Sequence, residues 1–219
     1  MSAWSFSRIK AFQTCPLQYL EVKVLKHYQE TQHPTTVYGL RGHGALEHRV
    51  DSGTVLPSEF AYLEPFAQGL LDMPGHTFCE LELACTKDKL PAGFHSEEAW
   101  CRGIIDVLKF QDTTAVAMDY KFGKVRPTSQ LKLMALLVFA NYPTVQTVKT
   151  RFLWIQFRDK TDGVYHRKDV DQMWEEFEAD AAQLELAHET GDFQPRPSGL
   201  CKAHCVVSSC SYYQRGNRR

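Results

Sequence analysis

The segment AWCRGIIDVLKFQDTTAVAMDYK, residues 99–121, decides the fold. Residues 99–110 and 114–121 are two mainly apolar runs, and runs of this length are typical of strands buried in a sheet. The polar residues 111–113 between them predict a tight turn. We therefore expect two neighbouring strands here, paired as a hairpin.

Further strands are expected on both sides of this segment. Residues 77–85 alternate between two faces, which predicts a strand before the hairpin. Residues 147–158 predict a strand after it, paired with a short strand at 164–167 across the turn Asp162-Gly163.

Helical patterns alternate with these strands. They cover residues 5–25 with a break at Pro16, 37–51, 58–72 with a break near Pro65, 128–141 starting at Thr128 or Ser129, and a long amphipathic stretch that ends at Gly191. In the second helix, Leu40, Leu46 and Val50 are expected to face inward. This order predicts an α/β fold with a central mixed β-sheet flanked by helices.

The charge is unevenly distributed along the chain. The 219 residues contain 25 Lys and Arg against 26 Asp and Glu, a net charge of −1. Nine of the acidic residues lie within 169–192, so the other 195 residues carry an excess of eight positive charges. This remainder is compatible with a polyanionic ligand. No window of about 18 apolar residues and no signal-like N-terminus occur, so we expect a cytoplasmic protein without membrane contact.

Three of the seven cysteines are close together near the C-terminus. Cys201, Cys205 and Cys210 follow the spacing C-x3-C-x4-C. In an intracellular chain, such a group suggests ligation of zinc or of an iron–sulfur cluster by thiolates. The fourth ligand is expected to be Cys15, with His204 as an alternative that would favour zinc.

A second set of polar residues lies on the strands. Asp119 and Lys121 are two apart on one strand, so their side chains leave the same face. Asp106, on the preceding strand, converges with Asp119 if the two strands pair. A divalent cation relieves the repulsion between two close carboxylates. Glu80 or Glu82 could add an oxygen ligand, and His43 a nitrogen ligand, which would suit Mn²⁺ as well as Mg²⁺.

The ordered series of these residues resembles a known family. It runs G-x-x-x-H from Gly39 to His43, then Glu80, G-I-I-D from Gly103 to Asp106, D-Y-K-F-G-K from Asp119 to Lys124, and Q-L at Gln130. It resembles the PD-(D/E)XK nucleases of the RecB-like exonuclease branch. The opening SFSRIKAFQTCPLQYL is similar to the members that carry an iron–sulfur cluster, such as the AddB nuclease domain, CRISPR-associated RecB-like exonucleases and phage nucleases.

This resemblance implies a site and a fold. A restriction-endonuclease-like core would occupy about residues 37–168 of a single domain, 1–219, and segments 5–25 and 169–213 would be joined by a 4Fe–4S cluster. The metal ligands would be His43, Asp106, Asp119 and the Tyr120 carbonyl, Lys121 would be catalytic, Gln130 would orient substrate or Lys121, and Glu80 would assist. The cluster ligands would be Cys15, Cys201, Cys205 and Cys210, although the x3 and x4 spacing departs from the common x2 and x5.

The expected function is metal-dependent hydrolysis of DNA, by an exonuclease of a phage or a bacterial cell that uses Mg²⁺ or Mn²⁺. Its substrate would be single-stranded DNA or duplex ends, and a recombination, annealing or integrase protein could be its partner. Tyr212, Tyr213, Arg215, Arg218 and Arg219 are candidates for contacts with a strand. The alternatives are a non-catalytic DNA-binding or assembly module with the nuclease fold, and a zinc-stabilised interaction protein.

Overall fold

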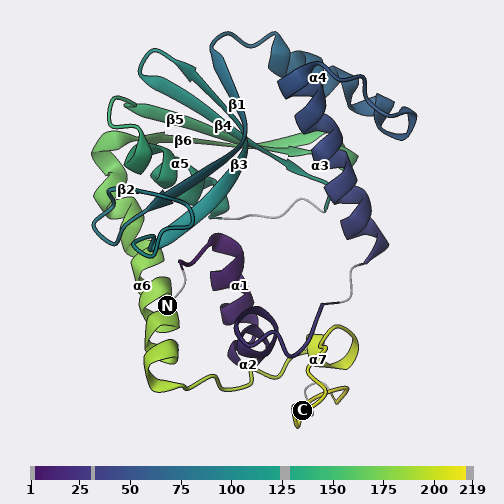
Figure 1. The fold of residues 1–219 in the computed structure, drawn as a ribbon, viewed down its shortest axis with the longest axis vertical. Helices are drawn as coiled ribbons and strands as arrows, with labels where there is room; N and C mark the ends of the chain where they lie inside the picture. The colour runs from purple at the N-terminus through teal and green to yellow at the C-terminus, as the bar shows by residue number, and fades with distance from the viewer. Residues whose placement is uncertain (1–2, 31–32, 124–128, 216–219) are drawn as a thin grey trace. The chain divides into compact units, whose positions relative to one another are not determined.

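The structure is a computed structural model that describes residues 3–30, 33–123 and 129–215. The chain divides into two compact units. The sheet unit contains residues 33–174, and the terminal unit combines residues 3–32 with residues 175–219. The helices and strands of both units are labelled in Figure 1.

The sheet unit holds a six-stranded mixed sheet in the order β2-β1-β3-β4-β5-β6 (Figure 1). Its strands are β1 (His76–Cys85), β2 (Pro91–Ala92), β3 (Cys101–Gln111), β4 (Thr114–Lys121), β5 (Thr147–Trp154) and β6 (Asp159–His166). Neighbouring strands are antiparallel except β4 and β5, which are parallel because helix α5 (Gln130–Asn141) connects them. The predicted α/β fold with a central mixed sheet flanked by helices is confirmed.

The hairpin that the sequence predicts over residues 99–121 is present. Strands β3 and β4 pair from Gln111↔Thr114 to Val107↔Met118. Asp112, in the turn, has a φ of +52°, a backbone conformation that aspartate tolerates better than most residues.

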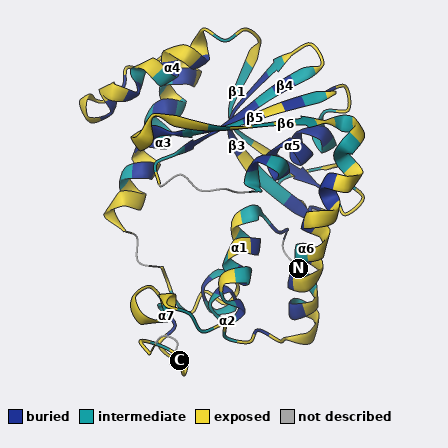
Figure 2. Cartoon of the chain, turned by 180° about the vertical axis from the view of Figure 1, so that it is seen from behind, coloured by how far each residue is buried: buried dark blue, intermediate teal, exposed yellow. Residues whose placement is uncertain are grey.

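Helices α3 (Pro34–Ser52) and α4 (Glu64–Leu71), with the 3₁₀ helix η2 (Ser58–Leu63) between them, cover one face of the sheet. Leu46 and Val50 of α3 join Val107, Met118 and Tyr120 of the sheet in one buried cluster. Figure 2 shows buried segments along α3 and along the strands. Burial of such apolar side chains is the main stabilising contribution to the unit.

The expectation that Leu40 faces inward was wrong, because its side chain is 60% exposed. On this helix Phe122 occupies the space that an inward side chain would need, since its ring lies against Gly39 and Gly42. A Cβ atom added to Gly42 would lie 2.3 Å from the Cζ atom of Phe122. The glycines of α3 therefore make room for this ring.

Helix α5 packs closely on the sheet. Leu137 lies so near Gly103 that a Cβ atom there would be 2.9 Å from its Cδ1 atom, and the Asn141 amide donates to the Ala84 carbonyl at 3.1 Å. Ser129 occupies the N-cap position without a capping hydrogen bond from its side chain. The alternative start, Thr128, lies outside the described residues.

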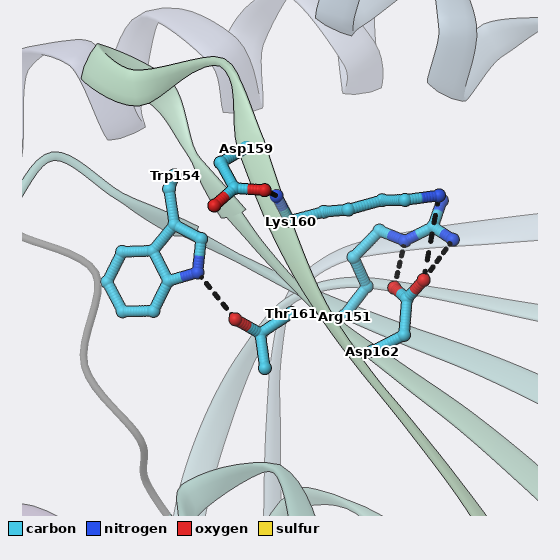
Figure 3. A network of polar contacts seen from close by, with 6 residues as sticks. All are labelled: Arg151, Trp154, Asp159, Lys160, Thr161 and Asp162. Atoms are coloured by element: carbon cyan, nitrogen blue, oxygen red, sulfur yellow. Dashed lines mark hydrogen bonds and ion pairs between the residues drawn. The ribbon is translucent and has the colours of Figure 1, made fainter.

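The pairing expected after β5 was wrong in its register. The connection is a 3₁₀ turn (Ile155–Phe157) followed by Arg158 at a φ of +49°, and Asp162 and Gly163 lie in the middle of β6. Figure 3 shows the reason for this register. The Arg151 guanidinium binds Asp162 through two hydrogen bonds of 2.5 and 3.0 Å, and the Trp154 indole N–H donates to Thr161 at 2.8 Å. These cross-strand pairs keep Asp162 and Gly163 within β6, although the two residues have the composition of a turn.

The terminal unit begins with three short helical segments. They are α1 (Phe6–Thr14), α2 (Pro16–Tyr19) and a π-helical turn, η1 (Leu20–Val24). Ser5 caps α1 by accepting from the Arg8 amide at 3.4 Å. Cys15 is extended between α1 and α2, and Pro16 occupies the first position of α2, where its missing N–H costs nothing. The predicted interruption at Pro16 is confirmed.

The core of the terminal unit is aromatic. Trp4 stacks on Phe177 of α6 (Val170–Thr190) with ring centroids 6.3 Å apart. Tyr19 stacks on Phe193 at the same distance, and its hydroxyl lies 3.2 Å from His188 Nε2. These contacts join the N-terminal helices to the helix that follows the sheet in sequence.

Helix α6 has the predicted acidic outer face and a buried inner face. Met173, Trp174, Phe177, Ala181 and Leu184 are all buried. The helix ends before Gly191, whose φ of +71° is the left-handed conformation typical of a C-terminal glycine. Neither α6 nor any other helix within the described ranges combines the length and apolarity that crossing a membrane requires.

Candidate metal centre and cysteine pocket

The centre of the candidate site is a break in the sheet. Strands β1 and β3 pair continuously except between Cys79↔Val107 and Leu81↔Ile105, where Glu80 faces Asp106. Glu80 has a φ of +47°, which is unfavourable for a residue with a side chain. Strain of this kind is kept where the surrounding structure holds it, and it is frequent at functional sites.

The β3–β4 hairpin stops pairing at the residues next to this break. The β3–β4 ladder ends at Val107↔Met118, so Asp106 and Asp119 are the next residues on the two strands. The Asp106 carboxylate accepts the Tyr120 backbone N–H at 2.7 Å. A side chain thus replaces a backbone partner, and it satisfies a buried amide where the strands separate.

His43 of α3 completes a group with these strand residues. Its Nδ1 lies 3.1 Å from Asp106 Oδ2. One ligand atom each from His43, Glu80 and Asp106 lie within 4.8 Å of one another, and among the described residues this is the one such group of three. The imidazole is held against Tyr120 and Phe122, with ring centroids 5.6 and 5.5 Å away.

Asp119 lies beside this group with a different set of partners. Its Oδ2 accepts from Lys121 Nζ at 2.7 Å and from Gln130 Nε2 at 3.0 Å. Its Oδ1 is buried and accepts no hydrogen bond from the described part of the chain. A buried carboxylate oxygen without a partner is costly, unless a proton or a cation binds it.

Electrostatic interactions within the site are unfavourable without a cation. Burial and the Asp106 charge raise the pKa of Asp119 to about 6, although Lys121 opposes the shift. Burial and Asp106 also raise the pKa of Glu80. Burial acts to lower the pKa of His43, but the hydrogen bond and charge of Asp106 outweigh it, so this pKa is raised as well. Burial is the largest cause of the raised pKa of Asp119 and of Glu80, and the negative charge of Asp106 contributes to all three shifts.

This donor set fits a divalent cation. Carboxylate oxygens suit Mg²⁺ and Mn²⁺, and one imidazole nitrogen is accepted by Mn²⁺ in particular. The bare Oδ1 of Asp119 and the group His43, Glu80 and Asp106 supply four candidate ligands. Glu82, the alternative to Glu80, is exposed instead and lies 4.0 Å from His95.

The terminal unit contains a second candidate site. Cys15, Cys201, Cys205 and Cys210 line one pocket, although 186 residues separate the first from the second. All four are free thiols. Burial raises the pKa of Cys205, and the other three sulfurs raise it further, which is the electrostatic sign of their convergence.

The backbone N–H groups of Arg196 and Ser198 donate hydrogen bonds to two of these sulfurs. The Arg196 N–H donates to Cys15 Sγ and the Ser198 N–H donates to Cys201 Sγ, each at 3.4 Å. The Arg196 guanidinium also donates to the Gln13 carbonyl, which ties this segment to α1. Amide donors stabilise thiolates and tune metal centres that thiolates ligate. The sequence analysis did not single out these amide donors. The one sign of them in the sequence was the segment PRPS, residues 195–198.

The remaining predicted contacts lie around the pocket and beyond it. Tyr212 and Tyr213 line the cysteine pocket, and Arg215 is exposed. Arg218 and Arg219, with Lys124 of the D-Y-K-F-G-K motif, lie outside the described residues.

Phe122 of the D-Y-K-F-G-K motif was not singled out in the sequence, yet it packs on α3 next to His43. In the sequence, the two glycines Gly39 and Gly42, three residues apart, were the sign that a bulky side chain packs on this helix.

Comparisons with known proteins give the family of the chain and a solved structure with a similar fold. The family model of the PD-(D/E)XK nuclease superfamily matches residues 3–213. A crystal structure of a candidate exonuclease from Eubacterium rectale has a similar fold, with a TM-score of 0.54, 12% identity, and coverage of 99% of this chain and 90% of that chain. The structure of SSO0001 has a TM-score of 0.44 at 10% identity, covering 97% and 88%. A comparison with curated proteins finds no match.

The matched residues 3–213 include every candidate ligand and both units. A family match over nearly the whole chain carries more weight than any single motif, because D-x-K alone is common. This protein belongs to the PD-(D/E)XK nuclease superfamily.

Proposed function

We propose that this protein is a metal-dependent deoxyribonuclease, an exonuclease of the RecB-like branch. The observation that carries the proposal is the buried, unpartnered Oδ1 of Asp119 beside the group His43, Glu80 and Asp106. A buried carboxylate with a purely structural role normally has partners for both oxygens. An oxygen kept bare in a buried, negatively charged setting is what a cation ligand requires.

His43, Asp106 and Asp119 would hold the ion, with Glu80 and the Tyr120 carbonyl as further ligands. When bound, Mg²⁺ or Mn²⁺ supplies Lewis acidity toward a phosphoryl oxygen and lowers the pKa of water. The chain's own residues keep this position rigid. The Asp106 carboxylate is fixed by the Tyr120 amide, and Gln130 fixes Asp119 from the start of α5.

Lys121 is the proposed catalytic residue. Its ammonium group contacts Asp119 Oδ2 at 2.7 Å and lies 4.8 Å from the centre of the Phe152 ring, so it is held in place from two sides. A fixed positive charge next to the ligand set would orient the attacking water and stabilise charge that develops on the phosphate. Gln130 would then act through Asp119, since its amide donates to the same oxygen as Lys121.

The distribution of charge supports DNA as the substrate. Outside residues 169–192, the chain has an excess of eight positive charges, and a phosphate backbone binds basic surfaces. Tyr212, Tyr213 and Arg215 would add stacking and phosphate contacts. A role in DNA processing, recombination or CRISPR adaptation, with an annealing or integrase protein as partner, is part of the proposal.

The cysteine pocket is proposed to hold a structural 4Fe–4S cluster. In a zinc site, sulfurs about 2.3 Å from the metal would be about 3.8 Å apart. The four cysteines do not form a group whose ligand atoms all lie within 4.8 Å, whereas His43, Glu80 and Asp106 do. The wider spacing supports a body larger than one ion, and the amide donors to Cys15 and Cys201 support a centre that thiolates ligate.

The experiment is cleavage of end-labelled single-stranded and duplex DNA with Mn²⁺, Mg²⁺ or EDTA. Asp119→Ala should lower the rate by about 10²–10³-fold. Asp159→Ala is the matched control, because it removes an exposed carboxylate from the same sheet. If wild type, Asp119→Ala and the control bind DNA equally and none cleaves it, the protein is a binding module and the proposal is wrong.

A further inference from the structure

A hollow adjoins the proposed metal centre on the side of α3. Thr35, Thr36, Gly39 and Leu40 line it from the first turns of the helix, Phe122 and Gly123 from the end of β4, and His43 closes one end. All of these residues belong to the sheet unit. Because His43 is also in the group with Glu80 and Asp106, a substrate at the metal centre would continue into this hollow.

The character of the walls identifies what the hollow can bind. Among the described residues that line it there is no Lys, Arg, Asp or Glu, so these walls offer no ionic partner to a phosphate or a charged side chain. Leu40 is 60% exposed, an apolar surface that a ligand would cover. Threonine hydroxyls at the other end can donate and accept hydrogen bonds. The set suits a neutral, flat group with apolar faces and polar edges.

The walls are also rigid. Phe122 is wedged against Gly39 and Gly42 and lies edge-on to Tyr38, with ring centroids 6.3 Å apart. A fixed aromatic ring loses little entropy when a ligand covers it. The volume is about 280 Å³, just below the roughly 300–1,000 Å³ of pockets for drug-sized ligands. A hollow of this volume is large enough for one heterocycle.

We propose that this hollow binds the nucleobase of the nucleotide next to the scissile phosphate. This inference rests on the proposed nuclease function and names its substrate class. A base can enter only when it is unpaired, so the substrate is single-stranded DNA or a duplex end that has frayed by at least one base. Leu40 and Phe122 are the specificity-determining residues, and they act by apolar contact with the base.

The first test uses single-turnover cleavage of single-stranded oligonucleotides that carry one abasic site, moved one position at a time. At one position next to the cleaved bond, the missing base should slow wild type by roughly 5- to 150-fold, the equivalent of ~1–3 kcal/mol of base stacking. Leu40→Ala should cut the intact strand more slowly and lose this penalty. Val37→Ala truncates a half-exposed residue of the same helix that does not line the hollow, and it should behave like wild type.

A second measurement does not need cleavage. Single strands with 2-aminopurine at the same position are titrated with protein in Ca²⁺, and the fluorescence change should occur with wild type and Val37→Ala but not with Leu40→Ala. Cleavage without a position-dependent penalty, or a penalty that Leu40→Ala retains, overturns the base site and leaves the nuclease function intact. No cleavage with a Leu40-dependent fluorescence change supports the base site and contradicts the nuclease function. Neither signal overturns both.

Discussion

The two candidate sites are built in opposite ways. The carboxylate site of the sheet unit arises where three neighbouring strands stop pairing at one level, and ladders on both sides hold it. The cysteine pocket joins segments from the two ends of the chain. Short turns surround it, and single hydrogen bonds from backbone N–H groups reach two of its sulfurs. Strand pairing holds the first site, and burial together with the charge of Asp106 raises the pKa of Asp119 and of Glu80 there. The second site depends on contacts between segments far apart in the chain, and the proposed cluster would add to these contacts.

The largest expected effect is on the cysteine pocket. Cys205→Ser should remove the proposed cluster and expose residues 1–32 and 175–219 to proteolysis, because the metal-linked folding energy is lost with it. The sheet unit should stay resistant. Iron and sulfide analysis with limited proteolysis measures both effects, and Cys79→Ser, at a thiol outside the pocket, is the control. Equal resistance of both units in the variant would contradict the comparison.

Next in size is the loss of Lys121. Lys121→Met should reduce cleavage by about 10²–10³-fold with DNA affinity nearly unchanged, because a charge that acts in the transition state is removed. The melting temperature in EDTA should fall as well, because the buried Asp119 carboxylate loses its charge partner. Single-turnover rates and filter binding separate the two effects. A matching fall in affinity would mean that Lys121 binds substrate and does not serve the chemical step.

Removal of the Asp119 charge should stabilise the metal-free sheet unit. The pKa of Asp119 is raised from 3.8 to about 6 in the folded protein, so its ionisation disfavours folding, and this destabilisation develops as the pH rises from about 4 to 6. Asp119→Asn should therefore gain stability on the order of 1–3 kcal/mol at pH 7.

Denaturant unfolding in EDTA at pH 4 and pH 7 measures that gain, which should be small at the lower pH. Mn²⁺ should then reverse the order, because it stabilises wild type and not the variant. A variant less stable than wild type in EDTA at pH 7 would show that the carboxylate is not strained by charge.

The smallest effect concerns backbone strain at the break in β1. Glu80→Gly should relieve a left-handed conformation and stabilise the metal-free protein by about 1 kcal/mol. Asp112→Gly, at a φ of +52° in the β3–β4 turn, should give a similar gain. Only Glu80→Gly should weaken Mn²⁺ binding in calorimetry. Equal Mn²⁺ affinities in the two variants would remove Glu80 from the site.

Much of the sheet unit could be predicted from the sequence. Apolar runs and a polar turn predicted the hairpin of β3 and β4, and the two-residue period of a strand placed Asp119 and Lys121 on one side. These signals are local, so neighbouring residues suffice to carry them. The resemblance to RecB-like nucleases named the same residues, and the family match confirms the superfamily.

The predictions from the sequence were wrong where residues far apart in the chain determine the local structure. Asp162-Gly163 has the composition of a turn, yet Arg151 on the opposite strand places Asp162 within β6. Leu40 follows the helical period of α3, yet Phe122, more than 80 residues later, occupies the glycine face and leaves Leu40 exposed. A one-dimensional pattern cannot show which side chain from elsewhere will occupy a face.

The sequence by itself determined the order of elements, the strands that bear the acidic residues and the set of cysteines, because periodicity and residue chemistry are local properties. Only the tertiary structure decided that the ladders part at Glu80, Asp106 and Asp119, that one oxygen of Asp119 stays bare, and that a hollow lies beside His43. These features depend on register and on packing between segments far apart in the chain. The physical reason is that strand pairing and burial are set by the sum of many long-range contacts.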